Sequence, residues 1–222
     1  MKKTAYLLLF CCVITFSSCF EIIEQVFLKA DGSGTFQFVL NMSKSKTKLN
    51  SISKMKTING HDVPSKWEVE NKLQQIEKAM NKTVGVSAAK STMDYDNYIV
   101  TINCNFAKLS QLNAALKNAS KIDGGNVIGI DKTYSYDATT KTFVRQNKFP
   151  LKENYKKVSN ADKEVFATAG YTSIFKFENT ITESSNKDAT ISPSKKAIML
   201  KQTALDVITE KKSIENKIKL TK

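Results

Sequence analysis

The chain has 222 residues, of which 41% are hydrophobic and 25% are charged. This composition is that of a folded domain, and it excludes a disordered, collagen-like or polytopic membrane protein. Thirty-four Lys and Arg residues against 21 Asp and Glu residues give a formal net charge of +13, and Arg145 is the only arginine. One His, one Trp and four Cys leave little material for a metal site, an imidazole relay or a disulfide framework.

The first nineteen residues form the most specific pattern in the chain. Lys2 and Lys3 precede an apolar segment from Ala5 to Phe16, which has the length of a secretory signal and is too short to span a bilayer. Phe16-Ser17-Ser18-Cys19 resembles the lipobox of bacterial lipoproteins, although Phe16 departs from the usual Leu. In that family the Cys becomes the first mature residue and carries lipid on its thiol and amine. The alternatives are an ordinary cleaved signal and a short buried helix.

We therefore expect a lipoprotein signal peptide at 1–18 and a single lipid-anchored domain at 19–222. Cleavage before Cys19 removes Cys11 and Cys12, and lipid occupies the thiol of Cys19. Cys104 therefore remains as the only free thiol. Cys104 shares one face of an alternating segment with Tyr98, Val100, Ile102 and Phe106. The sequence shows no activating base for this thiol, and we expect it to be a buried core residue.

Lysines dominate the charge of the chain, with a local cluster at 44–56. Its members are Lys44, Lys46, Lys48, Lys54 and Lys56. Acyl chains on Cys19 would hold the protein at a membrane without help from lysines, at about 0.8 kcal/mol per buried methylene. The lysines are therefore expected to form a solvated surface, with contact between the cluster and anionic head groups or acidic glycans as the second interpretation. We expect no nucleic-acid partner, because such proteins rely on Arg for bidentate contacts.

The mature chain is predicted to alternate between hairpins and amphipathic helices. A first hairpin spans 24–42, with the turn at 30–34 and an aromatic inner face. A Lys-studded helix is expected at 43–58. Ser65 and Glu68 form a capping box at the start of a helix whose apolar face carries Val69, Leu73, Ile76 and Met80.

The same alternation continues to the C-terminus. A second hairpin pairs Val84, Val86 and Ala88 with the 98–106 strand, and a helix follows at 109–119. A third hairpin is expected at 128–149, a short helix at 160–169, and strands at 171–181, 196–202 and 214–220. No βαβ rhythm is present. The predicted fold class is α+β, with antiparallel β hairpins and three to four amphipathic helices packed on one face of the sheet.

Three segments support a family resemblance. The lipobox, the 27–38 hairpin and the 171–177 strand resemble uncharacterised small envelope lipoproteins of Lys- and Asn-rich bacteria, and more weakly the LppM-type lipoprotein domain. This resemblance implies an exported α+β lipoprotein of the cell envelope. It transfers no catalytic residue to this chain.

Candidate chemistry is sparse outside the lipobox. His61-Asp62 suggests a base with its orienting carboxylate, but no Gly-x-Ser-x-Gly elbow accompanies it. Asp94, Asp96 and Asn97 begin like a Ca²⁺ loop, yet the required Gly and distal Glu are missing, so we interpret them as turn residues. The stretch 123–126 lacks the spacing of a phosphate loop. We expect no catalytic residue, no cofactor and no metal.

Twelve Phe and seven Tyr residues are expected to fill the core, although the same residues would line a cavity for an apolar ligand. For Trp67, near the start of the capped helix, two interpretations stay open: exposure, where it could meet a membrane interface or a glycan, and the more common half-buried packing role. The predicted function is non-enzymatic binding or scaffolding at the membrane surface, with lipid on Cys19 as the membrane contact. An envelope protein or an anionic lipid or glycan is the expected partner, and the outer membrane is the expected location. The alternatives are a carrier of an apolar ligand and, third, a hydrolase that uses His61.

Overall fold

The computed structural model describes residues 20–123, 132–147 and 150–221. Three sequence expectations therefore lie outside the described residues: the signal peptide with Cys19, the glycines at 124–125, and the first part of the third hairpin at 128–131. The expectations for the remaining elements are compared with the structure below.

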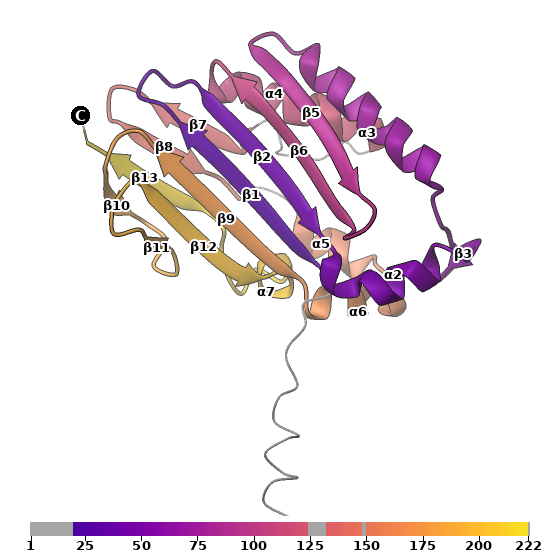
Figure 1. The fold of residues 1–222 in the computed structure, drawn as a ribbon. Coiled ribbons are helices and arrows are strands. Elements are labelled where there is room, and N and C mark those ends of the chain that lie inside the picture. The colour runs from indigo at the N-terminus through magenta and orange to yellow at the C-terminus, as the bar shows by residue number, and fades with distance from the viewer. Residues whose placement is uncertain (1–19, 124–131, 148–149, 222) are drawn as a thin grey trace, which may run out of the picture.

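A seven-stranded sheet forms the first layer of the molecule, with strand order β11-β12-β9-β1-β2-β6-β5 (Figure 1). Its strands in chain order are β1 (Glu21–Leu28), β2 (Gly34–Asn41), β5 (Val86–Asp94), β6 (Ile99–Phe106), β9 (Gly170–Phe177), β11 (Thr190–Ile191) and β12 (Ala197–Thr203). The predicted hairpins β1–β2 and β5–β6 are both confirmed as antiparallel pairs.

The β1–β2 hairpin depends on its turn residues. Asp31 accepts hydrogen bonds from the backbone N and the hydroxyl of Ser33, at 2.9 and 2.7 Å. Gly32 has a φ of +86°, which favours glycine. At Gly34 a Cβ atom would lie 1.9 Å from the carbonyl oxygen of Phe27, so only glycine fits where β2 begins.

The hairpin pattern did not predict how the two hairpins and the C-terminal strands join into one sheet. β1 pairs in parallel with β9, from Glu21 opposite Gly170 to Leu28 opposite Phe177. β12 then pairs antiparallel with β9. The sheet is therefore mainly antiparallel with β1 at its centre, and the C-terminal strands complete it beside the N-terminal hairpin.

The second layer combines two helices and a smaller sheet. The helices are α3 (Lys66–Asn81) and α4 (Leu109–Ser120), which pack on each other and on β5 and β6. The smaller sheet has the order β10-β13-β8-β7, from β7 (Tyr134–Asp137), β8 (Thr142–Arg145), β10 (Ile181–Ser184) and β13 (Asn216–Leu220). The α+β class with helices on one face is confirmed, and this four-stranded sheet covers the part of the same face that the helices leave.

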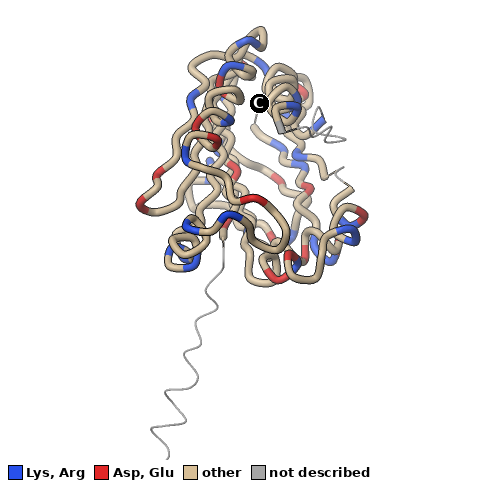
Figure 2. The backbone as a smooth tube through the Cα atoms, turned by 90° about the vertical axis from the view of Figure 1, so that its right-hand side faces the viewer, with Lys and Arg blue, Asp and Glu red and all other residues tan. Residues whose placement is uncertain are grey.

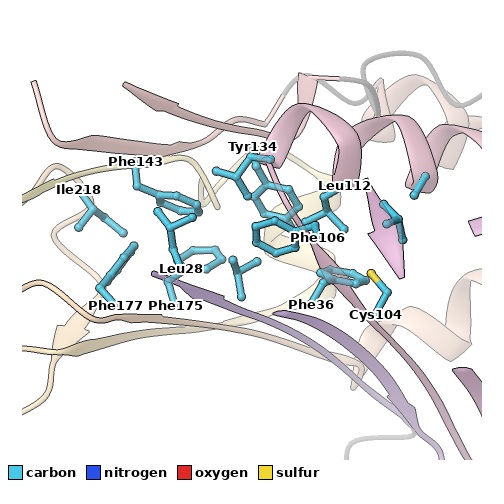
Figure 3. Packing of buried hydrophobic residues seen from close by; sticks show 14 of the residues in the cluster. Leu28, Phe36, Cys104, Phe106, Leu112, Tyr134, Phe143, Phe175, Phe177 and Ile218 are labelled. Atoms are coloured by element: carbon cyan, nitrogen blue, oxygen red, sulfur yellow. The ribbon is translucent and has the colours of Figure 1, made fainter. Parts of the chain in front are cut away.

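Aromatic rings fill the space between the two layers (Figure 3). Phe143 of β8 contacts Phe175 and Phe177 of β9, with ring centroids 5.1 and 5.4 Å apart. Tyr134 of β7 contacts Phe36 and Phe175 in the same way, at 6.4 Å each. The aromatic faces thus pack against one another, which corresponds to the core interpretation of these residues.

The remaining helices lie together at one end of the large sheet, where β1 begins (Figure 1). They are a short 3-10 turn (Ser43–Ser45) continued by α2 (Lys46–Ile52), and α5 (Leu151–Lys156), α6 (Asn160–Ala167) and α7 (Ala204–Ile208). The predicted helix at 43–58 is therefore shorter than expected, because it ends at Ile52. The last two residues of that range form the β3 strand (Thr57–Ile58), which pairs with β4 (His61–Asp62) in a small hairpin. α5 and α7 were not predicted, because segments of six and five residues show too little periodicity.

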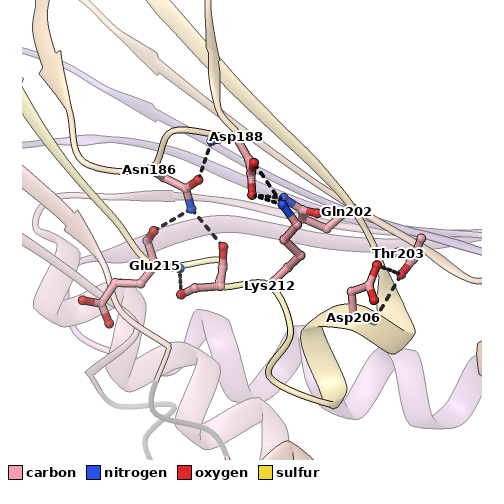
Figure 4. Close-up of polar contacts among 8 residues, drawn as sticks. Asn186, Asp188, Gln202, Thr203, Asp206, Lys212 and Glu215 are labelled. Atoms are coloured by element: carbon pink, nitrogen blue, oxygen red, sulfur yellow. Dashed lines mark hydrogen bonds and ion pairs between the residues drawn. The ribbon is translucent and has the colours of Figure 1, made fainter.

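Side-chain contacts hold the C-terminal segment in place (Figure 4). Thr203 caps α7 by accepting from the backbone N of Asp206 at 3.1 Å. The ammonium of Lys212 and the amide of Gln202 both reach Asp188, at 2.9 and 3.1 Å. These contacts connect the loop before β11 with the segment between α7 and β13.

Three details of the second hairpin differ from the prediction. A bulge between Ser87 and Lys90 leaves Ala88 exposed, with a φ of +51°, and Ala89 takes the buried position. Val84 lies outside the strand and is exposed, because β5 begins only at Val86. Tyr98 has a φ of +54° and belongs to the turn, so β6 begins at Ile99. The register from Val100 to Phe106 is otherwise as predicted, with Cys104 on the core face.

Candidate functional site

Phe20, the first described residue, lies at the end of the sheet where α2, α5, α6 and α7 gather; we call this the anchor end. The Phe20 carbonyl accepts a hydrogen bond from the backbone N of Gly170 at 2.9 Å, which extends the β1–β9 pairing by one residue. Its ring packs edge-on against Phe166 of α6, with centroids 6.1 Å apart. The chain is thus fixed in the fold from the residue that follows Cys19.

An apolar hollow of about 120 Å³ opens beside Phe20. It lies between α2 and α6 and is lined by Phe20, Met42, Ser45, Lys48, Leu49, Ile52 and Val165. Leu49 and Ile52 are the apolar positions of α2, so this short helix presents its apolar side to the hollow. Its lysines are exposed.

The chain around α2 carries positive charge without compensation from its own sequence. Lys44, Lys46, Lys48, Lys54 and Lys56 all lie in it. No Asp or Glu occurs between Asp31 and Asp62. Figure 2 shows basic residues along the helices at this end of the molecule. By contrast, α5 and α6 alternate lysines with carboxylates such as Glu153 and Asp162, which makes α2 the more strongly basic element.

Apolar side chains are exposed near these lysines and at the start of α3: Met55 lies between Lys54 and Lys56, Val165 shares the first hollow with Lys48, and Trp67 follows Lys66. Met55 is 53% exposed, Trp67 70% and Val165 40%. A second hollow of about 450 Å³ lies between α2, the start of α3 and the β5–β6 turn, with Val63, Pro64 and Val69 on its wall. Of the two interpretations of Trp67, the structure supports exposure. Basic and apolar groups side by side are the combination that favours an interface between water and lipid.

His61 lies near the same end, on the β3–β4 hairpin. Its Nε2 lies 3.3 Å from a carboxylate oxygen of Asp162, and Asn59 donates to the other oxygen at 3.2 Å. Asp162 also accepts from the Ser159 hydroxyl at 2.6 Å, and this hydrogen bond is the main reason that the pKa of Asp162 is lowered.

The structure does not pair the His61 imidazole with the Asp62 carboxylate. The imidazole contacts Asp162 instead. A hydrolytic triad needs the imidazole between the hydroxyl and the carboxylate. Here the carboxylate lies between Ser159 and His61, and its contact with Ser159 belongs to the N-terminal cap of α6. The contact joins the hairpin to α6.

The other sequence candidates have structural roles. Cys104 is buried, and burial raises the pKa of its thiol to about 12, so it holds its proton at neutral pH. Asp94 accepts hydrogen bonds from the backbone N atoms of Asp96 and Asn97 at 2.9 and 3.0 Å, as expected of turn residues. Within residues 20–123, 132–147 and 150–221, no three His, Cys, Asp or Glu side chains are grouped in a way that could hold a metal ion.

The sequence did not predict the buried ion pair between Arg145 and Glu24, which is the kind of charged cluster often found at functional sites. Arg145 of β8 donates to both carboxylate oxygens of Glu24 of β1, at 3.0 and 2.8 Å, and the Tyr171 hydroxyl of β9 donates to Glu24 at 3.0 Å. Arg145 also donates to the backbone oxygen of Gln146. Burial raises the pKa of Glu24, but Arg145 and the hydrogen bonds lower it further, and the net shift is downward.

This cluster connects the two sheets of the molecule, because β1 and β9 belong to the large sheet and β8 to the small one. Its partners neutralise and hydrogen-bond one another, which is what a buried charge requires. We therefore interpret it as structural. The signal in the sequence was Glu24 at an inward position between apolar residues, together with the only arginine of a Lys-rich chain.

No protein-family model matches the sequence, and no curated protein matches it. Among solved structures, the NMR structure of the folded domain of LppM from Mycobacterium tuberculosis is similar, with a TM-score of 0.44 and 13% identity. The overlap covers 93% of this chain and 92% of that one. The LppM-type domain is the weaker of the two resemblances that the sequence shows.

No helix among the described residues is both long enough and apolar enough to cross a membrane.

Proposed function

We propose that the protein is a lipid-anchored protein of the bacterial cell envelope, attached through lipid on Cys19, that acts by binding at the membrane surface and not by catalysis. The observation that carries this proposal is the position of Phe20. Consecutive Cα atoms lie about 3.8 Å apart, so lipid on Cys19 would hold the anchor end directly against the head groups.

The composition of the anchor end supports this orientation. The lysines around α2 face solvent, with the exposed side chains of Met55 and Val165 near them and exposed Trp67 at the start of α3. Each Lys close to an anionic surface contributes about 1 kcal/mol of attraction. Acyl chains would supply the attachment, and the lysines would orient the domain and favour anionic lipid.

The chemistry of the described residues supports binding over catalysis. The thiol of Cys104 is buried and protonated, and the imidazole of His61 contacts a capping carboxylate. The aromatic side chains of the two layers pack on one another. A carrier would instead need an apolar cavity between the layers.

The attachment is tested by Cys19→Ser. Metabolic labelling with a fatty acid should label the wild-type protein and not the variant, and the variant should accumulate as precursor or leave the membrane fraction. Persistent labelling of Cys19→Ser would overturn the proposed attachment.

The orientation is tested with Trp67, the only tryptophan of the chain. In the lipidated protein reconstituted into vesicles, brominated lipids should quench Trp67 more strongly when the vesicles contain anionic lipid. Replacing Lys44, Lys46 and Lys48 with Gln should remove most of that increase. The matched control replaces Lys78, Lys82 and Lys108, which are exposed on the helical layer, and should keep it. Equal quenching in all variants would contradict the proposed orientation.

A further inference from the structure

The large sheet has a second face that no layer covers within residues 20–123, 132–147 and 150–221. The helices α3 and α4 and the smaller sheet all pack on its core face, and Figure 1 views the sheet from the opposite side. We call this opposite side the outer face. Its central part consists of three rows of side chains that run across β12, β9, β1, β2, β6 and β5.

The strand register defines these rows. The first row is Met199, Ile174, Gln25, Gln37, Asn103 and Lys90. The second is Ala197, Lys176, Phe27, Thr35, Asn105 and Ser87, and the third is Lys201, Thr172, Ile23, Val39, Thr101 and Thr92. Across six strands the rows extend over about 24 Å, at about 4.8 Å between neighbouring strands.

The composition of the three rows is unusual for this chain. They contain three lysines and no Asp or Glu, although the whole chain has 21 acidic residues. Amides and threonines gather on β2, β6 and β5, and apolar side chains lie on β9 and β1. The three central rows are therefore positively charged, rich in hydrogen-bonding groups and apolar along part of their centre. The next row toward the anchor end carries the carboxylates of Glu21 and Asp94, and Glu21 accepts a hydrogen bond from the Thr172 hydroxyl at 2.8 Å.

A shallow hollow of about 310 Å³ lies on this face, between Gln25, Gln37, Asn103, Phe27 and Lys176. Gln25 donates to the Gln37 side chain at 2.9 Å, which orients both amides. The side chains of Asn103 and Asn105 make no hydrogen bond within the described part of the chain. Both asparagines line the same hollow as Phe27 and Lys176.

We propose that the outer face binds an acidic polysaccharide that lies across the strands. Side-chain amides match the donors and acceptors of sugar hydroxyls. Lysines pair with the carboxylates of uronic acids, and the apolar floor around Phe27 can contact the C–H face of a sugar ring. The rows are long enough for several sugar units.

Charge decides between this ligand and a second copy of the chain. Two outer faces packed on each other would bring the three lysines of each central part together, with carboxylates supplied only from the row of Glu21 and Asp94 at the anchor end. Like charges across an interface are costly. An anionic polymer meets the same lysines with opposite charge. The inference is independent of the membrane contact, because the lysines of α2 lie at the anchor end and not in these rows.

The test uses the full lipidated chain in micelles of a neutral detergent, titrated with a fluorescent oligomer of polygalacturonate. The outer-face variant combines Gln37→Glu, Asn103→Asp and Lys176→Gln. Its matched control replaces Lys44, Lys46 and Lys48 with Gln, which lowers the net charge by the same amount at the anchor end. The outer-face variant should lose about tenfold or more in affinity, which corresponds to about 1.4 kcal/mol, whereas the control should lose less than about threefold.

Three results would overturn the proposal. Equal losses in the two variants would show an effect of overall charge. Binding of polyglutamate as strong as that of polygalacturonate, with the same loss in the outer-face variant, would show an anion surface without selectivity for sugars. Concentration-dependent self-association that the outer-face variant abolishes would identify a second copy as the occupant. Neutral dextran should bind much more weakly than polygalacturonate, and an equal affinity would contradict the role of the lysines.

Discussion

The two faces of the large sheet carry opposite chemistry on the same strands. On β2, Phe36 enters the aromatic core while its neighbour Gln37 lies on the outer face. On β6, Cys104 is buried and Asn103 faces outward. Because successive side chains of a strand alternate between faces, positions one residue apart should differ completely in what their substitution affects. Core-face substitutions should reduce stability, and outer-face substitutions should reduce binding.

The largest effect on stability is expected from Arg145→Met on the core side. The substitution leaves Glu24 buried without its counter-charge, and breaking a buried pair in this way costs about 3–5 kcal/mol. Urea unfolding of the variant should show this loss. The double variant Glu24→Met with Arg145→Met should recover most of it, since no buried charge remains. A double variant as unstable as the single one would contradict the structural interpretation of the pair.

A loss of about 3 kcal/mol is expected from Cys104→Asp, because the new carboxylate has no partner in the core. Asn103→Asp, one residue away, should change the free energy of unfolding by less than about 0.5 kcal/mol. Thermal or urea unfolding measures both, and thiol reagents should label Cys104 only after unfolding. Equal damage from the two substitutions would mean that the strand is in the opposite register.

The Glu24 carboxyl also predicts a pH dependence of stability. Its pKa in the folded protein lies below its ordinary value of 4.5, so the stabilisation is fully present above about that pH and is lost as the pH falls through the folded pKa. Unfolding measured between neutral and acidic pH should therefore bring wild-type and Glu24→Gln closer together in acid. A difference that stays constant over this range would contradict the charged state assigned to Glu24.

The smallest effect is expected at His61, away from both sheet faces. His61→Ala removes an exposed contact with Asp162 and should change stability by less than about 0.5 kcal/mol. Any activity found for the protein should also persist. Loss of an assayed activity with the fold intact would restore the hydrolase hypothesis.

The sequence predicted local pairing well, because alternation and turn chemistry are local signals. The hairpin around Gly32 and the core position of Cys104 follow from them, as does the capping box at Ser65, in which Ser65 accepts from the Glu68 backbone N at 3.2 Å. The pairing of β1 with β9 has no local signal, since any apolar strand satisfies the same pattern. The second sheet was missed for the same reason.

The candidate site was predicted in pieces and not as a whole. The lysine cluster at 44–56 is visible in the sequence, and lipid attachment at Cys19 stays a prediction. Nothing in the pattern places Val165 beside Leu49 and Ile52 of α2. The outer face was hidden in a similar way. Its three central rows join residues from six strands, and their lack of carboxylates becomes visible only when the register is known.

The parallel β1–β9 pair has a consequence for the order in which the protein folds. Arg145 and Tyr171 reach Glu24 across 121 and 147 positions of the chain, so the centre of the molecule closes only after its C-terminal third is available. Contacts of this range slow folding, because a long loop must close before they form. A chain that emerges from its N-terminus first has β1 and β2 long before β9 and β12. Slow closure of the fold would leave β1 of such a chain without its β9 partner until the C-terminal third is available.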